Sequence, residues 1–306
     1  MRAKTGSVLL IANPAAGTYT ADMTDTVRRQ FADSGREVTL ALTEYAGHAG
    51  KLAARASEPG GPDVVVSLGG DGTAHEVVSG LADTAGGPPG TRPALLVLPS
   101  GTGNSFYREI WADRPWHDAL RLAATAPRTR DVDLARVAEN GALALLGAST
   151  GVVAQSLITA RDITGDGRDR YAQAVATSLR SFSPYPGRVT VDGEIVQEGP
   201  TVFANIGGGR FRGGRFELLP RSVMDDGLLD VCVVGDLLPL RDLPALALDG
   251  GHVGRAGVVY ARGRRVVVER TDGRPLVFEY DGDLVSAPSS LFTLDVLPGA
   301  LRVLAP

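Results

Sequence analysis

Residues 69–73 form the feature that most constrains the fold of this 306-residue chain. They read Gly-Gly-Asp-Gly-Thr and lie between the apolar run Val64–Leu68 and a segment with apolar residues at helical spacing. Where a strand of an α/β sheet gives way to a helix, glycines let a phosphate approach main-chain N–H groups, and the helix start adds a favourable dipole. Asp71 can act there on a metal ion or on an attacking hydroxyl. The pattern predicts a phosphate-binding loop, and the competing interpretation is a simple turn of Gly and Asp.

Two other apolar runs end in loops of the same kind. The run at 95–98 is followed by Pro-Ser-Gly-Thr-Gly-Asn at 99–104, and the run at 8–11 by Asn-Pro-Ala-Ala-Gly at 13–17. In an open α/β sheet, ligands collect at the carboxyl ends of the strands. One phosphate-rich ligand could therefore contact all three loops.

The composition of the chain limits what such loops could bind and which kinds of site the chain can form. The net charge of −4 and the pI near 5.6 argue against a nucleic-acid-binding protein. The two lysines, Lys4 and Lys51, lie outside any Gly-Lys-Ser/Thr sequence, so arginine, backbone or metal must meet phosphate charge. The single cysteine, Cys232, excludes disulfides within the chain and thiolate zinc sites, and its apolar surroundings predict a buried thiol. No signal peptide opens the chain and no apolar stretch approaches the roughly 18 residues that span a bilayer, so we expect a cytoplasmic protein.

The chain has two parts with different patterns. Up to about Pro127, apolar strands ending near residues 12, 42, 68 and 98 alternate with helical segments, which predicts βα units and a largely parallel sheet. Beyond Asp131, β-rich runs separated by Gly, Asp and Pro turns predict an antiparallel sandwich. These runs are 132–137, 142–146, 188–191, 201–204, 229–234, 265–269, 276–280 and 292–296.

Two helical segments interrupt the predicted sandwich, near 152–161 and 170–181. The sequence Thr-Gly-Asp-Gly at 164–167 joins them. The stretch Pro127–Arg130 is the expected boundary, which gives domains 1–127 and 128–297.

Five segments, in order along nearly the whole chain, resemble the diacylglycerol kinase catalytic family, which includes bacterial lipid kinases, sphingosine kinases and ceramide kinases. They are Asn-Pro-x-x-Gly at 13–17, Gly-Gly-Asp-Gly-Thr followed by Glu76, Pro-x-Gly-Thr-x-Asn at 99–104, the stretch from Gly213 to Asp230, and Asp281-Gly282-Asp283. NAD kinases share the Gly-Gly-Asp-Gly turn, but the later segments look like the lipid kinases. The resemblance implies an NAD kinase-like α/β N-terminal domain with a mainly parallel sheet, completed by 298–306, and a C-terminal antiparallel β-sandwich domain that binds lipid.

The implied activity is transfer of the γ-phosphoryl group of ATP to a lipid hydroxyl, most simply from diacylglycerol to phosphatidic acid in phospholipid biosynthesis, with Mg²⁺ as a second cofactor. The three loops and the end of the second strand would hold the nucleotide. The residues concerned are Asn13, Pro14, Gly17, Thr43, Gly69, Gly70, Asp71, Gly72, Thr73, His75, Glu76, Gly101, Thr102 and Asn104. The lipid would lie in the second domain, in a cleft lined by the helical segments between 152 and 179. The expected partner is thus a lipid at a membrane surface, reached by peripheral contact, and the sequence leaves a homodimer open.

The resemblance also implies a metal site and two candidate bases. In bacterial diacylglycerol kinases the aspartate that matches Asp226 binds a structural magnesium ion with two backbone carbonyls, which would here belong to Val223 and Leu228. Asp225-Asp226-Gly227 could equally form a hairpin turn. The family's Asp-Gly-Glu motif ends in a glutamate taken as the general base, and the shorter Asp283 stands in its place. In the sphingosine kinase branch the aspartate that matches Asp71 is considered the base, so both carboxylates remain candidates.

Other departures from the family pattern keep the acceptor open. His75 stands where many members carry asparagine, and Ser105 replaces the aspartate of Gly-Thr-x-Asn-Asp-Phe. The arginine-rich loop at 207–216 could meet anionic headgroups or form an ordinary solvated hairpin. The alternatives are a sphingoid- or ceramide-type lipid kinase, an NAD kinase-like soluble kinase, and a non-catalytic nucleotide or lipid sensor.

Overall fold

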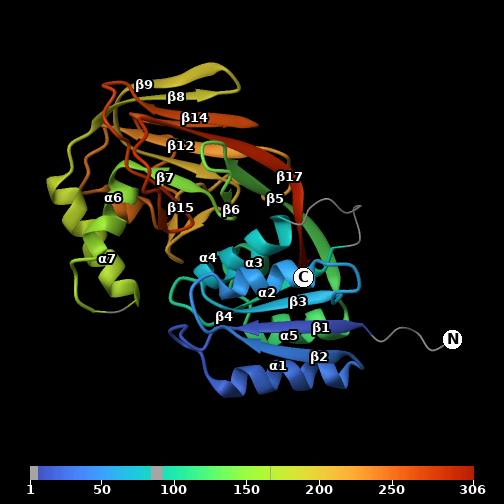
Figure 1. Ribbon diagram of the computed structural model, residues 1–306. Coiled ribbons are helices and arrows are strands. Elements are labelled where there is room, and N and C mark those ends of the chain that lie inside the picture. Colours follow the sequence, from blue (N-terminus) through green and yellow to red (C-terminus); the bar gives the residue numbers. More distant parts are fainter. Residues whose placement is uncertain (1–5, 84–91, 166) are drawn as a thin grey trace. The chain divides into compact units, whose positions relative to one another are not determined.

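The computed structural model describes residues 6–83, 92–165 and 167–306 (Figure 1). They form two compact units, one running to Val132 and taking in Gly299–Pro306, the other comprising Asp133–Pro298. The chain passes between the units inside two continuous strands, β5 (Arg128–Val137) and β17 (Leu291–Ala305). Asp166, expected in the turn between two helices, lies outside the described residues.

The first unit is built on a parallel sheet with the strand order β4-β3-β1-β2. These strands are β1 (Ser7–Ala12), β2 (Glu37–Leu42), β3 (Val64–Gly69) and β4 (Ala94–Pro99). The C-terminal part of β17 extends the sheet, because Val303 pairs in parallel with Leu95 of β4. Every residue of β3 is buried, which explains its continuous apolar sequence, since a parallel strand covered on both faces has no solvent side.

Helices cover both faces of this sheet. They are α1 (Ala21–Asp33), α2 (His48–Ala56), α3 (Asp71–Asp83), α4 (Ser105–Trp111) and α5 (Trp116–Thr125). Helix α2 packs against α3, and α1 packs against α5. Figure 1 shows α2 and α3 on one side of the sheet and α1 on the other. On α1, Val27 and Phe31 lie one turn apart and are fully buried, which is the apolar stripe that docks a helix onto a sheet.

The second unit consists mainly of antiparallel strands. From one edge the order is β16-β15-β7-β9-β8-β14-β17, and β12 pairs with both β9 and β13. The strands are β6 (Leu143–Ala144), β7 (Ala148–Thr150), β8 (Tyr185–Val191), β9 (Glu194–Gly207), β12 (Leu229–Gly235), β13 (Val258–Gly263), β14 (Arg265–Arg270), β15 (Phe278–Tyr280) and β16 (Asp283–Leu284). A separate two-stranded hairpin joins β10 (Phe211–Arg212) to β11 (Phe216–Glu217).

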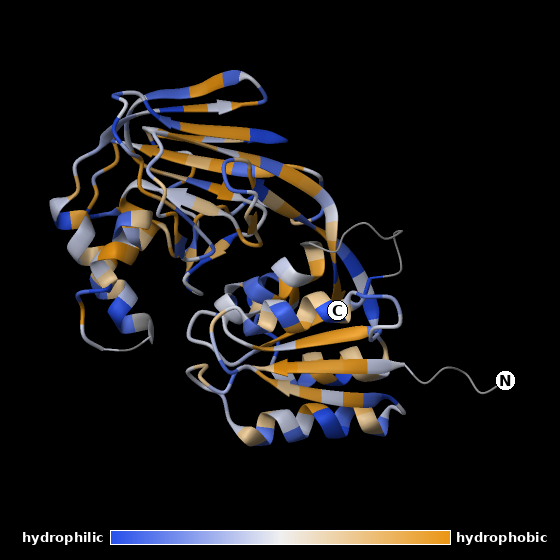
Figure 2. Ribbon diagram, in the orientation of Figure 1, coloured by the Kyte–Doolittle hydropathy of each residue, from blue (hydrophilic) through white to orange (hydrophobic). Residues whose placement is uncertain are grey.

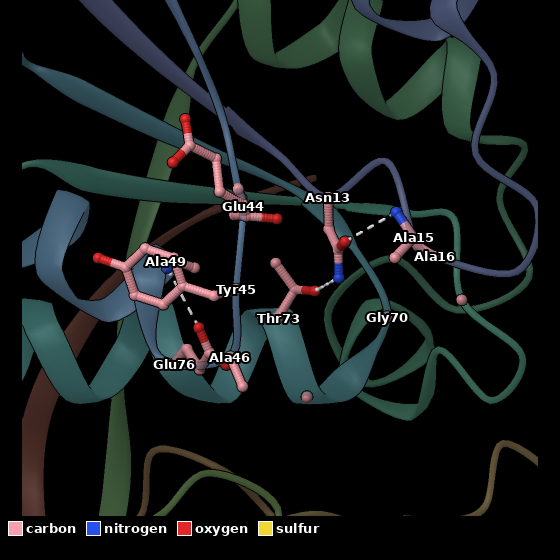
Figure 3. Close-up of a pocket in the computed structure, with 13 residues that line it drawn as sticks. Asn13, Ala15, Ala16, Glu44, Tyr45, Ala46, Ala49, Gly70, Thr73 and Glu76 are labelled. Atoms are coloured by element: carbon pink, nitrogen blue, oxygen red, sulfur yellow. Dashed lines mark hydrogen bonds between the residues drawn. The ribbon is translucent and has the colours of Figure 1, made fainter.

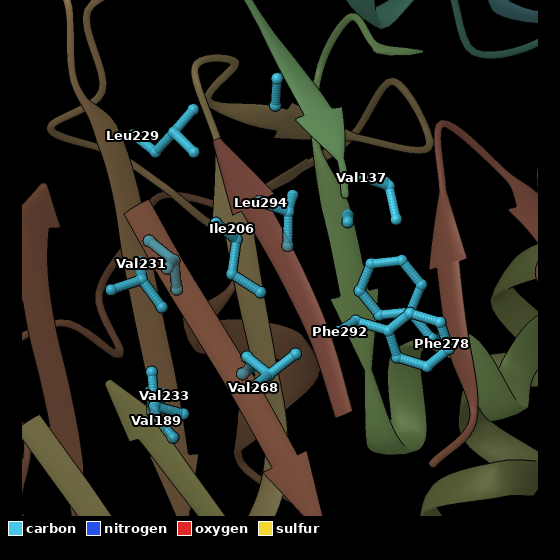
Figure 4. Packing of buried hydrophobic residues seen from close by; sticks show 14 of the residues in the cluster. Val137, Val189, Ile206, Leu229, Val231, Val233, Val268, Phe278, Phe292 and Leu294 are labelled. Carbon is cyan, nitrogen blue, oxygen red and sulfur yellow. The ribbon is translucent and has the colours of Figure 1, made fainter. Parts of the chain in front are cut away.

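Two apolar clusters lie on opposite faces of these strands. Strand β12 contributes Val231 and Val233 to the first cluster, and Cys232 and Val234 to the second. The first cluster includes the stacked rings of β15 and β17, whose centroids are 4.1 Å apart (Figure 4). The second is covered by α6 (Gly151–Ala160), α7 (Gly167–Ser181) and α8 (Leu243–Leu246). Apolar residues accordingly run along the strands of both units (Figure 2).

The expected fold class is confirmed: an α/β unit with a parallel sheet and a second unit rich in antiparallel strands. The four strands expected to end near residues 12, 42, 68 and 98 end within one residue of those positions, and Cys232 is fully buried as expected. Strand β13 was not expected, and the run 142–146 contains only the two-residue strand β6. No helix in the part of the chain that the structure describes is long and apolar enough to cross a membrane.

Candidate active site

Three loops meet at the carboxyl ends of β1, β3 and β4. The Asn13 N–H donates to the Leu68 carbonyl over 2.9 Å, and the Ser100 N–H donates to the Gly69 carbonyl over 2.9 Å. The Thr18 N–H in turn donates to the Ser100 carbonyl over 2.8 Å. The loops that the sequence singles out are therefore joined by main-chain hydrogen bonds into one surface.

Asn13 ties the first loop to the start of α3. Its Nδ2 donates to Thr73 Oγ1 over 3.0 Å, and its Oδ1 accepts the Ala15 N–H over 2.9 Å (Figure 3). The second bond closes a short turn of the kind that asparagine favours. Asn13 thus holds its loop beside the N-terminus of α3, where the helix dipole favours an anion.

The second and third loops approach each other backbone to backbone at Gly70 and Gly101. A Cβ added to Gly101 would lie 2.3 Å from the Gly70 Cα, so only glycine fits there. Asn104 adopts a left-handed φ of 56°, and its amide bonds both the N–H and the carbonyl of Gly101. The Pro-x-Gly-Thr-x-Asn segment is therefore a rigid loop held against the glycine-rich turn.

These loops and the start of α2 enclose a pocket of about 450 Å³, a size that suits a small-molecule ligand (Figure 3). Seven of the residues predicted to bind nucleotide line it: Asn13, Thr43, Gly70, Gly72, Thr73, Glu76 and Gly101. The other predicted residues belong to the same loops but do not line the pocket: Pro14, Gly17, Gly69, Asp71, His75, Thr102 and Asn104. The sequence analysis did not single out Tyr45, which lines the pocket, is half-exposed and stacks on His48 with ring centroids 4.6 Å apart.

Two carboxylates at this pocket accept hydrogen bonds from backbone N–H groups. Asp71 Oδ2 and Oδ1 accept the N–H groups of Ser105 and Phe106 over 2.9 and 3.0 Å, which secures the first turn of α4. Glu76 accepts the N–H groups of Gly47 and Ala49 at the start of α2 over 2.8 and 3.1 Å. Both carboxylates thus satisfy donors that a helix start leaves unpaired.

In the second unit, Asp281-Gly282-Asp283 forms the turn between β15 and β16. The Asp281 carboxylate accepts the N–H groups of Leu145, Leu146 and Gly147 over 2.5, 2.8 and 3.1 Å. Asp281 itself has a left-handed φ of 47°. The side chain of Asp283 is exposed. Asp281 is therefore the anchor of the turn, and Asp283 is the carboxylate that it presents to solvent.

A further carboxylate, Glu279, lies just before this turn and was not singled out from the sequence. It is only 4% exposed, and its Oε2 accepts the Gly282 N–H over 2.9 Å. Burial raises the pKa of Glu279 to about 7, while hydrogen bonds from Ser149 and Gly282 and the charge of Arg212 act in the opposite direction.

Below α6 and α7 the second unit contains a small, nearly apolar cavity. Its apolar walls come from α6, α7, β9, β11 and α8, and include Val152, Val175, Leu179, Phe203, Phe216 and Leu243. Tyr171 and Arg212, together with Ser156, form its polar wall. Neither alternative left open for the arginine-rich loop, contact with anionic headgroups or a solvated hairpin, describes Arg212. It is buried, and its guanidinium donates to carbonyls that include Gly209 and Leu146 over 3.0 Å.

Comparison with known proteins identifies the family. Residues 7–137 match the diacylglycerol kinase catalytic domain, and residues 147–305 match the YegS C-terminal NAD kinase beta sandwich-like domain. A "Probable lipid kinase YegS-like" from Chromohalobacter salexigens is 30% identical over 279 residues, which cover 90% of this chain and 86% of the relative. The chain belongs to the diacylglycerol kinase catalytic family.

Two further relatives and one solved structure are similar to this chain over most of its length. The "Probable lipid kinase YegS-like" of Pseudomonas aeruginosa is 32% identical over 90% of this chain and 86% of its own length. The "Diacylglycerol kinase" of Bacillus subtilis is 29% identical over 84% of both chains. A crystal structure of a putative diacylglycerol kinase from Bacillus anthracis has the same fold, with a TM-score of 0.76, 22% identity and coverage of 100% of this chain and 99% of that one.

The magnesium site expected of this family member does not fit the residues as they stand. The Asp226 carboxylate accepts the Leu228 N–H over 3.1 Å and pairs with the guanidinium of Arg262. Arg262 lies opposite Asp230 on the neighbouring strand, and its Nε is 3.5 Å from the buried Asp230 carboxylate. A cation at Asp226 would have to displace this arginine. Within the described ranges, no group of three or more His, Cys, Asp or Glu side chains is arranged to hold a metal ion.

Proposed function

We propose that the chain is an ATP-dependent lipid kinase that transfers the γ-phosphoryl group to a lipid hydroxyl, with diacylglycerol as acceptor and phosphatidic acid as product. The observation that carries the proposal is the pocket at the carboxyl ends of β1, β3 and β4, formed by glycine-rich loops and the N-terminus of α3. The names of the relatives, probable lipid kinase and diacylglycerol kinase, agree with it.

The first unit would bind the nucleotide. Backbone N–H groups near Gly70 and Gly72 suit the phosphates, and the exposed ring of Tyr45 suits the base. Bound with the nucleotide, Mg²⁺ would neutralise part of the phosphate charge. Positioning and electrostatic stabilisation would supply most of the rate, because phosphoryl transfer needs little covalent chemistry from the protein.

The second unit would bind the lipid. Its apolar cavity, of about 40 Å³, suits the terminal carbons of an acyl chain, and α6 and α7, which line it, are the helices expected from the sequence to do so. Because such a substrate resides in a bilayer, the enzyme would act by peripheral contact with a membrane.

Asp71 and Asp283 remain the two carboxylates that the sequence assigns to catalysis. The two N–H groups held by Asp71 support a role in positioning the loops around the phosphates. The exposure of Asp283 leaves it available to solvent and to a substrate. We propose a part for both in the reaction, and the test below separates them.

The test is transfer of radiolabelled phosphate from ATP with Mg²⁺ to diacylglycerol, monoacylglycerol, ceramide, sphingosine and NAD. The native protein is run beside Asp71→Asn, Asp283→Asn and the exposed-residue control Glu194→Gln. Labelled phosphatidic acid that is lost in an Asp variant and retained in the control is the expected result. Labelled ceramide or sphingosine would move the chain to the sphingoid branch. Labelled NAD with unlabelled lipids, or ATP binding without any product, would overturn the lipid kinase proposal.

A further inference from the structure

Glu279 belongs to a buried polar row that crosses three strands. It pairs with Ser149 across β15 and β7, and Ser149 pairs with Asn205 across β7 and β9. The three residues are at most 4% exposed. They occupy the same face of the sheet as Cys232, which belongs to the apolar cluster under α6, α7 and α8.

The row directs donors toward the Glu279 carboxylate. Asn205 Nδ2 donates to Ser149 Oγ over 2.6 Å, and the Ser149 hydroxyl hydrogen-bonds the carboxylate. The Gly282 N–H supplies a second donor over 2.9 Å. Asn205 Oδ1, fully buried, has no hydrogen-bond partner among the described residues. Neighbouring donors thus orient the Glu279 carboxylate, and the buried Asn205 Oδ1 has no partner among the described residues. This arrangement is typical of a functional site rather than of an ordinary core.

Glu279 also lies close to the polar wall of the apolar cavity. The charges of Glu279 and Arg212 interact, and Glu279 acts electrostatically on Tyr171. Tyr171 and Arg212 both line that cavity. The cavity therefore has apolar walls that suit the end of a lipid chain and, beside its polar wall, the Glu279 carboxylate.

We propose that Glu279, rather than Asp283, accepts the proton of the lipid hydroxyl during phosphoryl transfer. The inference rests on the proposed function and names the base of that reaction. As the lipid oxygen bonds to the γ-phosphorus, the bond from phosphorus to the β-γ bridging oxygen breaks and ADP leaves. The lipid O–H bond breaks at the same time, and its proton passes to Glu279 and later to solvent.

Two observations favour Glu279 over Asp283. Glu279 keeps the full length of the glutamate that the family's motif carries, whereas Asp283 is one methylene shorter and exposed. A base is most effective when its pKa lies near the working pH, and the pKa of Glu279 is raised to about 7. The groups that face it are Tyr171 from α7, Arg212 from β10, Asp281 from the turn and the donors Ser149 and Gly282.

The experiment measures kcat and KM for the lipid accepted by the native enzyme, between about pH 5 and pH 9, for native protein, Glu279→Gln, Asp283→Asn and the control Glu194→Gln. The native enzyme should show a rise of kcat/KM around pH 7, and Glu279→Gln should abolish this rise and lower kcat by about 10²- to 10⁴-fold. Asp283→Asn should keep that rise, and the control should match the native profile. Thermal unfolding of each variant verifies that it is folded.

Native kcat in Glu279→Gln, or loss of the rise in Asp283→Asn alone, would overturn the proposal. A purely structural Glu279 would lower activity without moving the pH profile, which also counts against it. Should Glu279→Gln fail to fold, Glu279→Asp takes its place: a reduced kcat with the pH rise retained is expected, and a native kcat overturns the proposal. If the native protein transfers phosphate to no lipid, the proposed function is wrong. That result differs from one in which the native protein is active and only the role of Glu279 is wrong.

Discussion

The buried carboxylate of Glu279 predicts a dependence of folding stability on pH that Glu279→Gln removes. Burial raises its pKa from an ordinary value of 4.5 to about 7, and the negative charge of Asp281 adds to the rise. Arg212, Ser149 and Gly282 offset part of it. Burial also raises the pKa of the neighbouring Tyr171, which therefore stays neutral across this range. A rise from 4.5 to about 7 corresponds to about 3 kcal/mol of folding free energy.

The direction of the effect follows from proton linkage. The folded state holds the Glu279 proton more tightly than the unfolded state does. The resulting stabilisation is complete below pH 4.5, is lost as the pH rises from 4.5 to about 7, and stays lost above that value. Glutamine keeps the shape and carries no charge, so Glu279→Gln should equal the native protein near pH 4.5 and exceed its stability by up to about 3 kcal/mol near pH 8.

Urea unfolding followed by circular dichroism, at about pH 5, 6, 7 and 8, measures this difference. Comparing two proteins at each pH cancels the titration of all other groups. Glu194 is an exposed glutamate in the same unit, so the stability of Glu194→Gln relative to the native protein should not depend on pH. The reasoning would be refuted by a stability difference for Glu279→Gln that stays constant over this range, or by a native protein that is the more stable one near pH 8.

Three other predictions concern the remaining sites. Gly101→Ala should lower the melting temperature and weaken ATP binding, because the new Cβ would lie 2.3 Å from the Gly70 Cα. Calorimetry that gives the native melting temperature and the native ATP affinity would show that the two loops can move apart without cost. Tyr45→Ala should raise the KM for ATP about 3- to 10-fold while Tyr45→Phe does not, if the ring stacks on the base; equal KM values for all three proteins would contradict this. Magnesium without nucleotide should leave the melting temperature of the native protein unchanged. It should raise the melting temperature of Arg262→Ala, where the Asp226 carboxylate has lost its guanidinium partner. A rise in the native protein would show that the ion displaces Arg262.

Features that depend on neighbouring residues in the sequence were predictable. The apolar run Val64–Leu68 followed by Gly-Gly-Asp-Gly-Thr specifies a buried strand, a tight turn and a helix start within one stretch of chain. The hairpin at Asp281-Gly282-Asp283 is equally local, because a left-handed residue and a glycine form the turn.

Features that depend on distant residues were not predictable. Arg212 looks like a solvated residue in its own loop, but the carbonyls that it binds belong partly to Leu146 and Ile206. Glu279 alternates with Phe278 and Tyr280 as an exposed strand residue would, but α7 and the strand carrying Ser149 bury it. Tyr45 follows β2 in a segment without a motif, and its place in the pocket depends on loops from β1 and β3. The strongest available signal for Glu279 was a glutamate two residues before a family motif whose own glutamate is missing.

Asp71 and Asp281 do the same structural work in different units, which changes how their variants should be interpreted. Each sits at a glycine turn, and each carboxylate gathers N–H groups from another segment, two for Asp71 and three for Asp281. Asparagine offers only one acceptor oxygen, so either substitution leaves backbone donors unpaired and loosens the loop. Loss of activity in Asp71→Asn would therefore not by itself identify Asp71 as the base. A base must change the pH dependence of the reaction, and Glu279 in β15, which is buried and has a pKa raised to about 7, has the properties to do so.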